Sequence, residues 1–488
     1  MSELQDPNKY RVLRPGMRIH LVGIGGTGLS AVAAVLLGQG YVVSGSDRQL
    51  NELTNSLKSS GATVFEGHNG DQAKGADMLL VSSAIPATNP EIQAAEQAGI
   101  PILKRDEFLG LLMADSYGIA IAGSHGKTTT TGMIAQIMIE GGLDPSVVVG
   151  AVLPALQSNG RAGKSEFFVV EADEYDYMFL GLRPTLAIVV NVEYDHPDLF
   201  PSVSAYRQAF TDFVLKIHNE GLLLACIDDE GAAALADFAT TLPIRVSTYG
   251  LDRGEWQAVE VRPNQLGGSD FLVQHEGQTM GLIRLRVPGE HNVRNALAAV
   301  ATVSELGIGF DTVRRALASF GGLGRRFQLI GEVGDVTIVD DYAHHPTEIR
   351  ATLDAARQRF PGRRLWAVWQ PHTFSRTRAM LSEFASCFEQ ADRVVALDVY
   401  QSRESDTLGI DTAQVVARMQ GARASHVGDI VEAANYIFVR VLPGDVVLTL
   451  GAGDGNQVGN ILKLELERQL AQQLGQRQRG ENGPGRAD

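Results

Sequence analysis

The sequence has very few cysteines and no long apolar run. Cys226 and Cys387 are the only cysteines among 488 residues, too few for a disulfide framework or a cysteine-rich metal site. The apolar stretch Leu29–Leu37 is interrupted by Ser30 and is much shorter than the ~18 residues of a membrane-spanning helix. The first residues, MSELQDPNKYRVLRPG, lack the apolar centre of a signal peptide. These absences predict a cytoplasmic protein without membrane insertion.

An excess of positive charge is also absent. The 42 Lys and Arg residues are outnumbered by 57 Asp and Glu residues, and the formal net charge is −15. Proteins that wrap nucleic acid or anionic membranes need a basic face, so we expect neither partner. Glycine, in contrast, is abundant, with 53 residues that do not form a low-complexity tract. The positions at which these glycines cluster are therefore informative.

Short apolar runs alternate with amphipathic stretches along most of the chain, which is the pattern of parallel α/β units. The segment 246–286 differs, because strand-like residues alternate with turn residues there and predict an antiparallel insertion. At ~100–200 residues per domain, this length predicts three domains. A new strand opens near Asp115, and the glycine-rich segment GGLGRRFQ surrounds Leu323. We expect domains at 1–114, 115–322 and 323–472, followed by a disordered tail at 473–488.

The first glycine cluster follows a predicted strand, opens a helix and satisfies the pattern G-x-G-x-x-G. Such a loop lets the backbone approach a diphosphate held at the helix N-terminus, and an acid after the next strand can bind a ribose. The candidate residues are Gly23, Gly25, Gly26, Thr27, Gly28 and Asp47. Taken alone, the loop favours a dinucleotide oxidoreductase, with another nucleotide-diphosphate ligand or a purely structural turn as alternatives.

The second glycine cluster, GSHGKTTTT, also lies between a predicted strand and a helix. Backbone N–H groups can cradle phosphates there, the Lys127 ammonium can reach the β and γ oxygens, and the Thr128 hydroxyl can bind Mg²⁺. The loop is shorter than a usual P-loop, because Ile121 and not glycine stands five residues before Gly126. We expect a nucleoside triphosphate at Gly123, Ser124, His125, Gly126, Lys127, Thr128 and Thr129. Both loops in one chain favour an ATP-hydrolysing enzyme whose second substrate carries a diphosphate.

Acidic residues follow the next strands of the predicted central domain. Glu171 closes a buried run, and a carboxylate at a strand end beside the P-loop is a candidate Mg²⁺ ligand. Asp173, Glu174 and Asp176 come next, and we expect some of them to be solvated or structural. His196 follows a later strand and is a candidate for a second Mg²⁺, although a single histidine is more often an ordinary surface or core group.

Further candidates lie at helix starts and at the opening of the third domain. Asn292 and Asn295 can cap a helix, or they can contact adenine or phosphates. Arg325 and Arg326 can bridge domains or reach ATP phosphates. Four more candidates lie between a predicted strand and a predicted helix: Asp341, Tyr342, His344 and His345.

The two adjacent histidines raise the question of zinc. They point in different directions, however, and no further ligand follows at a useful spacing, so a substrate site is favoured. The segment QPHTFSRTR supports a substrate site, because Arg376 or Arg378 can clamp a carboxylate; either can also be a simple helix-face charge.

Together these motifs resemble the Mur ligase family, ATP-dependent enzymes that form amide bonds in peptidoglycan precursor synthesis. The resemblance extends to about Leu470 and rests on GSHGKTTTT, EADEYD, NVEYDHPD, PGEHNVRNALAA and DDYAHHPTEI. It implies an α/β fold with a Rossmann-like N-terminal domain, a P-loop ATPase-like central domain with a mostly parallel sheet, and a Rossmann-like C-terminal domain. It also implies ATP, UDP-N-acetylmuramate and L-alanine as substrates and Mg²⁺ as cofactor. We expect a monomer or a homodimer.

The resemblance implies roles for single residues as well. The first loop would bind the UDP diphosphate instead of a dinucleotide. The implied metal ligands are Thr128, Glu171 and His196. The ATP-binding residues implied outside the second loop are Asn292, Asn295, Arg326 and Asp341. The residues implied to position the amino acid or the muramyl carboxylate are Tyr342, His344 and Arg376. The residues implied to be catalytic are Lys127, His344 and Arg376.

The implied reaction transfers a phosphoryl group from ATP to the lactyl carboxylate, and the amine of L-alanine then attacks the acyl phosphate. Closure of the third domain would exclude water from this intermediate. Two departures from the family stand out: the stretch after the Asp-His pair offers Arg207 where relatives carry a carbamylated lysine, and Thr373 stands where many relatives have arginine. Rival interpretations are a murein-tripeptide recycling ligase of the same family, an NAD(P)-dependent oxidoreductase and a catalytically silent UDP-sugar-binding regulator.

Overall fold

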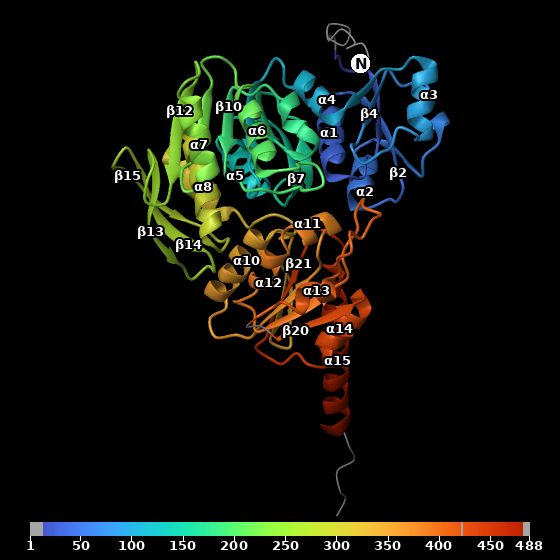
Figure 1. Ribbon diagram of the computed structural model, residues 1–488, viewed down its shortest axis with the longest axis vertical. Helices are drawn as coiled ribbons and strands as arrows, with labels where there is room; N and C mark the ends of the chain where they lie inside the picture. The colour runs from blue at the N-terminus through green and yellow to red at the C-terminus, as the bar shows by residue number, and fades with distance from the viewer. Residues whose placement is uncertain (1–12, 421–422, 482–488) are drawn as a thin grey trace, which may run out of the picture. The chain divides into compact units, whose positions relative to one another are not determined.

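Three β-sheets with flanking helices form the protein, which confirms the predicted α/β class with three sheets (Figure 1). The computed structural model describes residues 13–420 and 423–481. Contacts divide the chain into two units. The first comprises the chain up to Arg286 together with His291–Gly324, and the second comprises Val287–Glu290 together with the chain from Arg325. The predicted boundary at residue 114 does not separate contact units, so it stays a prediction.

The first sheet has five parallel strands in the order β3-β2-β1-β4-β5. Its strands are β1 (Arg18–Val22), β2 (Val42–Asp47), β3 (Thr63–Glu66), β4 (Met78–Val81) and β5 (Ile102–Lys104). The helices that connect them are α1 (Thr27–Gly38), α2 (Glu52–Ser59), η2 (Gly70–Ala73) and α3 (Pro90–Ala98), and α4 (Arg105–Leu112) follows β5. The strand order reverses direction at β1, and ligands of such sheets bind outside the strand ends at this switch point. The first glycine loop follows β1 directly.

The second sheet has ten strands in the order β15-β14-β13-β12-β11-β10-β6-β9-β7-β8. Its strands are β6 (Tyr117–Ala122), β7 (Ser146–Leu153), β8 (Ser158–Arg161), β9 (Phe167–Glu171), β10 (Leu186–Val189), β11 (Leu222–Cys226), β12 (Arg245–Gly250), β13 (Trp256–Pro263), β14 (Ser269–His275) and β15 (Gln278–Arg284). Its helices are α5 (Lys127–Glu140), η3 (Tyr175–Gly181), α6 (Val203–Val214), α7 (Glu230–Ala239), α8 (Glu290–Glu305) and α9 (Phe310–Ser319). The pairs β13–β14, β14–β15 and β7–β8 are antiparallel, so antiparallel pairing does occur within the predicted stretch 246–286.

The third sheet belongs to the second unit and has six strands in the order β16-β17-β21-β18-β19-β20. Its strands are β16 (Gln328–Val333), β17 (Val336–Asp341), β18 (Leu365–Trp369), β19 (Arg393–Leu397), β20 (Arg423–Gly428) and β21 (Val446–Leu450). Its helices are α10 (Pro346–Arg359), α11 (Phe374–Ala379), α12 (Leu381–Ser386), α13 (Thr412–Val416), α14 (Ile430–Phe438) and α15 (Gln457–Glu481). Only β16 pairs in the antiparallel direction among the described strands of this sheet.

Helix α15 runs into the stretch expected to be a disordered tail. It continues to Glu481, and the rest of that stretch, 482–488, lies outside the described residues. Its composition explains the continuation, since Leu, Glu, Gln, Arg and Ala are all good helix formers. No helix in the described part of the chain combines the length and apolar character needed to cross a membrane.

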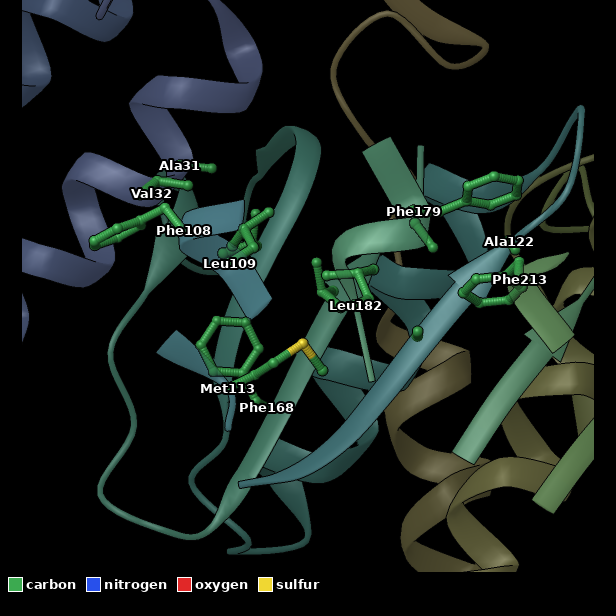
Figure 2. Packing of buried hydrophobic residues seen from close by; sticks show 14 of the residues in the cluster. Ala31, Val32, Phe108, Leu109, Met113, Ala122, Phe168, Phe179, Leu182 and Phe213 are labelled. Carbon is green, nitrogen blue, oxygen red and sulfur yellow. The ribbon is translucent and has the colours of Figure 1, made fainter. Parts of the chain in front are cut away.

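One apolar core connects the first two sheets. Figure 2 shows Phe108 and Leu109 of α4 and the following Met113 near Phe168 of β9, and Leu182 belongs to the same buried cluster. The contact is close, since a Cβ atom on residue 118 would come within 2.4 Å of the Met113 methyl group, and position 118 is glycine. Burying each large apolar side chain contributes about 1.5–3 kcal/mol. The core therefore fixes the first sheet against the second within the first unit.

Candidate functional site

The first glycine loop is held by its own neighbours. Gly23 has φ +89°, a conformation that favours glycine, and the N–H groups of Gly23 and Ile24 donate to the Ser46 carbonyl at 2.8 and 3.1 Å. The Gly25 N–H donates to Asp47 Oδ2 at 2.9 Å. Asp47, which the sequence predicts as a ribose ligand, therefore also fixes the loop backbone.

The rest of the loop begins helix α1. Gly26 is its N-cap residue and has no side chain with which to cap it, and Thr27 and Gly28 form the first turn. The first N–H groups of a helix and its dipole attract anions. The loop has the geometry of a phosphate-binding helix start at a switch point.

The second loop lies between β6 and α5, as predicted, and Lys127 folds back over it. Its Nζ is 2.5 Å from the Gly123 carbonyl, 3.2 Å from the Ser124 carbonyl and 2.6 Å from Glu174 Oε2. Burial opposes ionisation of Lys127, but neighbouring carboxylates, led by Glu174, raise its pKa above the usual value. The ammonium is therefore protonated at neutral pH and suited to anionic oxygens.

The predicted metal ligands Thr128 and Glu171 meet at this loop. The Thr128 hydroxyl donates to Glu171 Oε1 at 2.9 Å, and the Gly150 N–H donates to Oε2 at 2.7 Å. A hydroxyl and a carboxylate side by side are the hard oxygen donors that Mg²⁺ prefers. The donor set present here fits the predicted ion.

Glu174 connects the predicted residues, and sequence reasoning did not single it out. Its side chain is 1% exposed, and besides Lys127 it lies 3.6 Å from His196 Nε2 and accepts a 3.3 Å hydrogen bond from the Tyr206 hydroxyl. His196 adopts φ +55°, an uncommon conformation for histidine. Lys127 and His196, far apart in the sequence, thus share one buried carboxylate.

Helix α6 contributes Tyr206, a second residue that sequence reasoning missed. Its hydroxyl lies 2.8 Å from Ser124 Oγ, and burial raises its pKa well above 10, so the group stays protonated. The neighbouring Arg207 is exposed. Next to the position of the modified lysine expected in several family members, helix α6 therefore directs Tyr206, and not Arg207, toward the second loop.

Asparagines hold the second loop from both sides. Asn191 accepts from the His125 N–H at 2.8 Å and donates to the His125 carbonyl at 3.0 Å. The predicted residue Asn295 packs against Gly126, where an added Cβ would come within 2.6 Å of its Oδ1. Asn295 also donates to Asn292 at 3.3 Å, which leaves both predicted amides buried beside the loop.

In the second unit, Asp341 lies buried at the end of β17. Its carboxylate accepts from the N–H groups of Phe327 at 2.7 Å and Ala343 at 2.8 Å. Burial raises the pKa of Asp341 to about 6, and this effect outweighs the opposing charge of Arg326. A buried acid with a raised pKa marks a functional-site candidate.

The following residues form one cluster. The guanidinium of Arg326 lies 5.1 Å from the ring centre of Tyr342 and 3.8 Å from Glu348. His344 Nδ1 lies 3.0 Å from the Tyr342 carbonyl, and the His344 N–H donates to Glu348 at 3.0 Å. By contrast, His345 caps helix α10. The two adjacent histidines thus have different surroundings.

Burial distinguishes the two candidate arginines of helix α11. Arg376 is 2% exposed and its Nη1 lies 3.1 Å from His372 Nδ1, while Arg378 is exposed. The His372 ring lies 5.8 Å from that of His344. His372, which the sequence did not predict, thus contacts both His344 and Arg376, and the ring of Tyr342 lies 5.4 Å from that of His344.

Three family models match the chain. The model of the Mur ligase family catalytic domain covers residues 18–117, the Mur ligase middle domain covers 121–303, and the Mur ligase glutamate ligase domain covers 325–453. The chain belongs to the Mur ligase family, a family of ATP-dependent ligases, and the predicted membership is confirmed.

Individual relatives are similar over nearly the whole length. UDP-N-acetylmuramate–L-alanine ligase of Geobacter sp. (strain M21) is 43% identical over 455 residues, 92% of this chain and 98% of the relative. The enzyme of that name from Salinibacter ruber is 45% identical over 442 residues, 90% and 92% of the two chains.

Solved structures agree with this similarity. UDP-N-acetylmuramate-alanine ligase from Thermotoga maritima has a TM-score of 0.78 and is 29% identical, covering 93% of this chain and 100% of its own. A murein peptide ligase from Psychrobacter arcticus has a TM-score of 0.71 and is 26% identical, covering 92% and 99%.

Proposed function

We propose that this chain joins L-alanine to the lactyl carboxylate of UDP-N-acetylmuramate, with release of ADP and phosphate, in peptidoglycan precursor synthesis. The identity of 43–45% to two ligases of that name, along 90% or more of the chain, carries the proposal. The ATP requirement follows from membership of the Mur ligase family. We also propose a cytoplasmic location, because the reaction consumes ATP.

The first unit handles the phosphates in this mechanism. Lys127 spreads the charge that develops on the transferred phosphoryl group, because it is protonated and fixed on the loop carbonyls. Thr128, Glu171 and His196 would hold Mg²⁺, which when bound neutralises phosphate charge. Asn292 and Asn295 would contact the adenine end of ATP.

The first glycine loop holds the second substrate. Gly23, Gly25, Gly26, Thr27 and Gly28 would place their backbone against the UDP diphosphate, and Asp47 would keep the loop in shape and contact the ligand. The diphosphate then fixes the position of the lactyl carboxylate that attacks the γ-phosphorus of ATP. The product is an acyl phosphate, from which phosphate leaves when the amine attacks.

The second unit supplies the groups for the amino acid. Tyr342, His344 and Arg376 would position L-alanine, with the buried Arg376 guanidinium on its carboxylate. Arg326 would reach ATP phosphates and Asp341 the ATP ribose. His344, hydrogen-bonded at Nδ1, is suited to accept or hold a proton of the amine.

The test is ADP release with a panel of amino acids. With ATP, Mg²⁺ and UDP-N-acetylmuramate, we expect release that depends on L-alanine, and weaker turnover with glycine or L-serine, since a small group changes affinity by about 1–3 kcal/mol. Equal turnover without amino acid or without UDP-N-acetylmuramate contradicts the proposal.

A murein peptide ligase is the second candidate, because the structure from Psychrobacter arcticus is similar over most of its length. Offering L-alanine and the murein tripeptide together separates the two functions. Incorporation of the tripeptide in preference to L-alanine would assign the recycling reaction.

Tyr206→Phe tests the contribution of helix α6. Phenylalanine keeps the packing but removes the hydroxyl that reaches Ser124 and Glu174, so we expect kcat/KM for ATP to fall about 10-fold, the equivalent of one or two hydrogen bonds. ADP-release kinetics measure the change. Tyr249→Phe, at an equally buried tyrosine on β12, is the control and should leave the kinetics unchanged within about twofold. Equal effects of the two substitutions would exclude a specific role for Tyr206.

A further inference from the structure

Arg105, the first residue of α4, lies over the first glycine loop. A Cβ atom built on Gly28 would fall 1.6 Å from Arg105 Nη1 and 2.7 Å from its Cζ, so the guanidinium fills the space beside this glycine. The position is notable because the loop begins helix α1 with backbone N–H groups that attract an anion. A cation beside them adds to that attraction.

The same guanidinium reaches the acidic segment that follows β9. Arg105 Nη2 donates to Asp173 Oδ2 at 2.8 Å and lies 3.1 Å from the Met178 sulfur. The positive charges of Lys127 and His196 also act on the Asp173 carboxylate. Arg105 thus stabilises a carboxylate that also faces the ammonium of the phosphate loop.

The backbone around Arg105 is packed closely. A Cβ atom on Gly181 would come within 2.6 Å of the Asp106 carbonyl oxygen, and one on Gly110 within 2.4 Å of the Gly181 carbonyl oxygen. Helix α4 and η3 therefore approach through glycines, and the start of α4 is fixed against the second sheet. The side chain is placed by this packing and by Asp173.

Two of the guanidinium nitrogens take no part in the hydrogen bonds that the described residues make with Arg105. Within the described part of the chain, Nε is buried without a hydrogen-bond partner, and the hydrogen bonds of Arg105 run through Nη2. An arginine presents donors in a planar fork that suits phosphate oxygens. Of the two remaining nitrogens, Nη1 lies against Gly28.

We propose that Arg105 is a substrate-positioning residue: its Nη1 donates to the diphosphate held over the first loop while its Nη2 stays on Asp173. This inference rests on the proposed function, because it takes UDP-N-acetylmuramate as the ligand of that loop. Arg105 then contacts both the diphosphate of the UDP-sugar and the acidic segment beside Lys127. These two contacts position the diphosphate relative to the ATP phosphates.

Calorimetric titration of the full chain with UDP-N-acetylmuramate alone tests the proposal, with a non-hydrolysable ATP analogue titrated separately. We expect Arg105→Ala to raise the Kd for UDP-N-acetylmuramate about 10- to 100-fold, the range for a lost charge-assisted contact, with less than about threefold change for the ATP analogue. Arg105→Lys should recover part of the loss. Lys104→Ala is the matched control, since it removes an exposed cation one residue away that pairs with Asp176 at 3.2 Å.

Gly28→Ala provides a second route to the same result. Its methyl group displaces Nη1 in the wild-type background but meets no guanidinium in the Arg105→Ala background, so it should raise the Kd more in the former than in the latter. Unchanged UDP-N-acetylmuramate binding by Arg105→Ala, or an equal loss for both ligands, overturns the proposal. If the wild-type chain binds the ATP analogue but not UDP-N-acetylmuramate, the proposed function itself fails, and this inference fails with it.

Discussion

Lys127→Ala is expected to reduce ADP release about 10³-fold, the scale for losing a fixed charge that stabilises a transition state. Lys127 is protonated and lies on the carbonyls of the phosphate loop, so its ammonium is held beside the place where the phosphates would bind. Steady-state kinetics with all substrates measure the effect. Lys164→Ala, at an exposed lysine of the same unit, is the control. A Lys127→Ala variant that keeps more than a tenth of the activity would refute the role.

The same substitution also affects folding, and the two effects can be separated. Removing Lys127 takes the 2.6 Å ion-pair partner from the 1% exposed carboxylate of Glu174, and breaking a buried pair costs about 3–5 kcal/mol. Adding Glu174→Gln should restore part of the thermal stability without restoring ADP release. Recovery of activity together with stability would show that the loss was structural.

Arg376→Ala is expected to lower kcat/KM for L-alanine about 100-fold or more. A guanidinium on a carboxylate makes two charge-assisted hydrogen bonds, each with a net contribution of about 1.5–3 kcal/mol. The loss should appear in the KM for L-alanine, while binding of the ATP analogue by the first unit stays the same. Initial rates over a range of L-alanine concentrations measure it.

The chain contains a matched control for this prediction two residues away. Arg378→Ala removes an exposed arginine from the same helix, whose contact is a 3.5 Å approach to the Leu408 carbonyl, and should change KM less than about threefold. Arg376→Lys keeps the positive charge but not the planar pair of donors. Its KM for L-alanine should therefore lie between the values of the Arg376→Ala and Arg378→Ala variants. Equal changes of KM in the Arg376 and Arg378 variants would contradict the assignment of Arg376 to the L-alanine carboxylate.

Much of the fold follows from hydrophobic periodicity. The short apolar runs that predict parallel α/β units include 18–22, 365–369 and 446–450. These runs coincide with β1, β18 and β21, because they are buried on both sides and bounded by turns. The first and second glycine loops also lie between a strand and a helix, as the sequence predicts. Sheet order was not predictable, since it depends on pairings such as that of β6 with β10 and β9.

The candidate site likewise contains residues that could be predicted from the sequence and residues that could not. Lys127, Thr128 and Glu171 could be grouped from the sequence because the strands before them, β6 and β9, are parallel neighbours and end at the same edge. Tyr206 could not, because an aromatic residue on the apolar face of an amphipathic helix is typical of a core position. Arg105 resembles an ordinary first-turn charge, and only the fold brings it to Gly28 and Asp173.

The apolar core shared by the first two sheets has a consequence for how this chain is assembled. A fragment cut at residue 114 would expose Phe108, Leu109 and Met113 to water on one side and Phe168 on the other. At about 1.5–3 kcal/mol for each side chain, neither half is expected to remain stable alone. The two parts that carry the glycine loops therefore stabilise each other, and the smallest autonomous folding unit is expected to contain both loops.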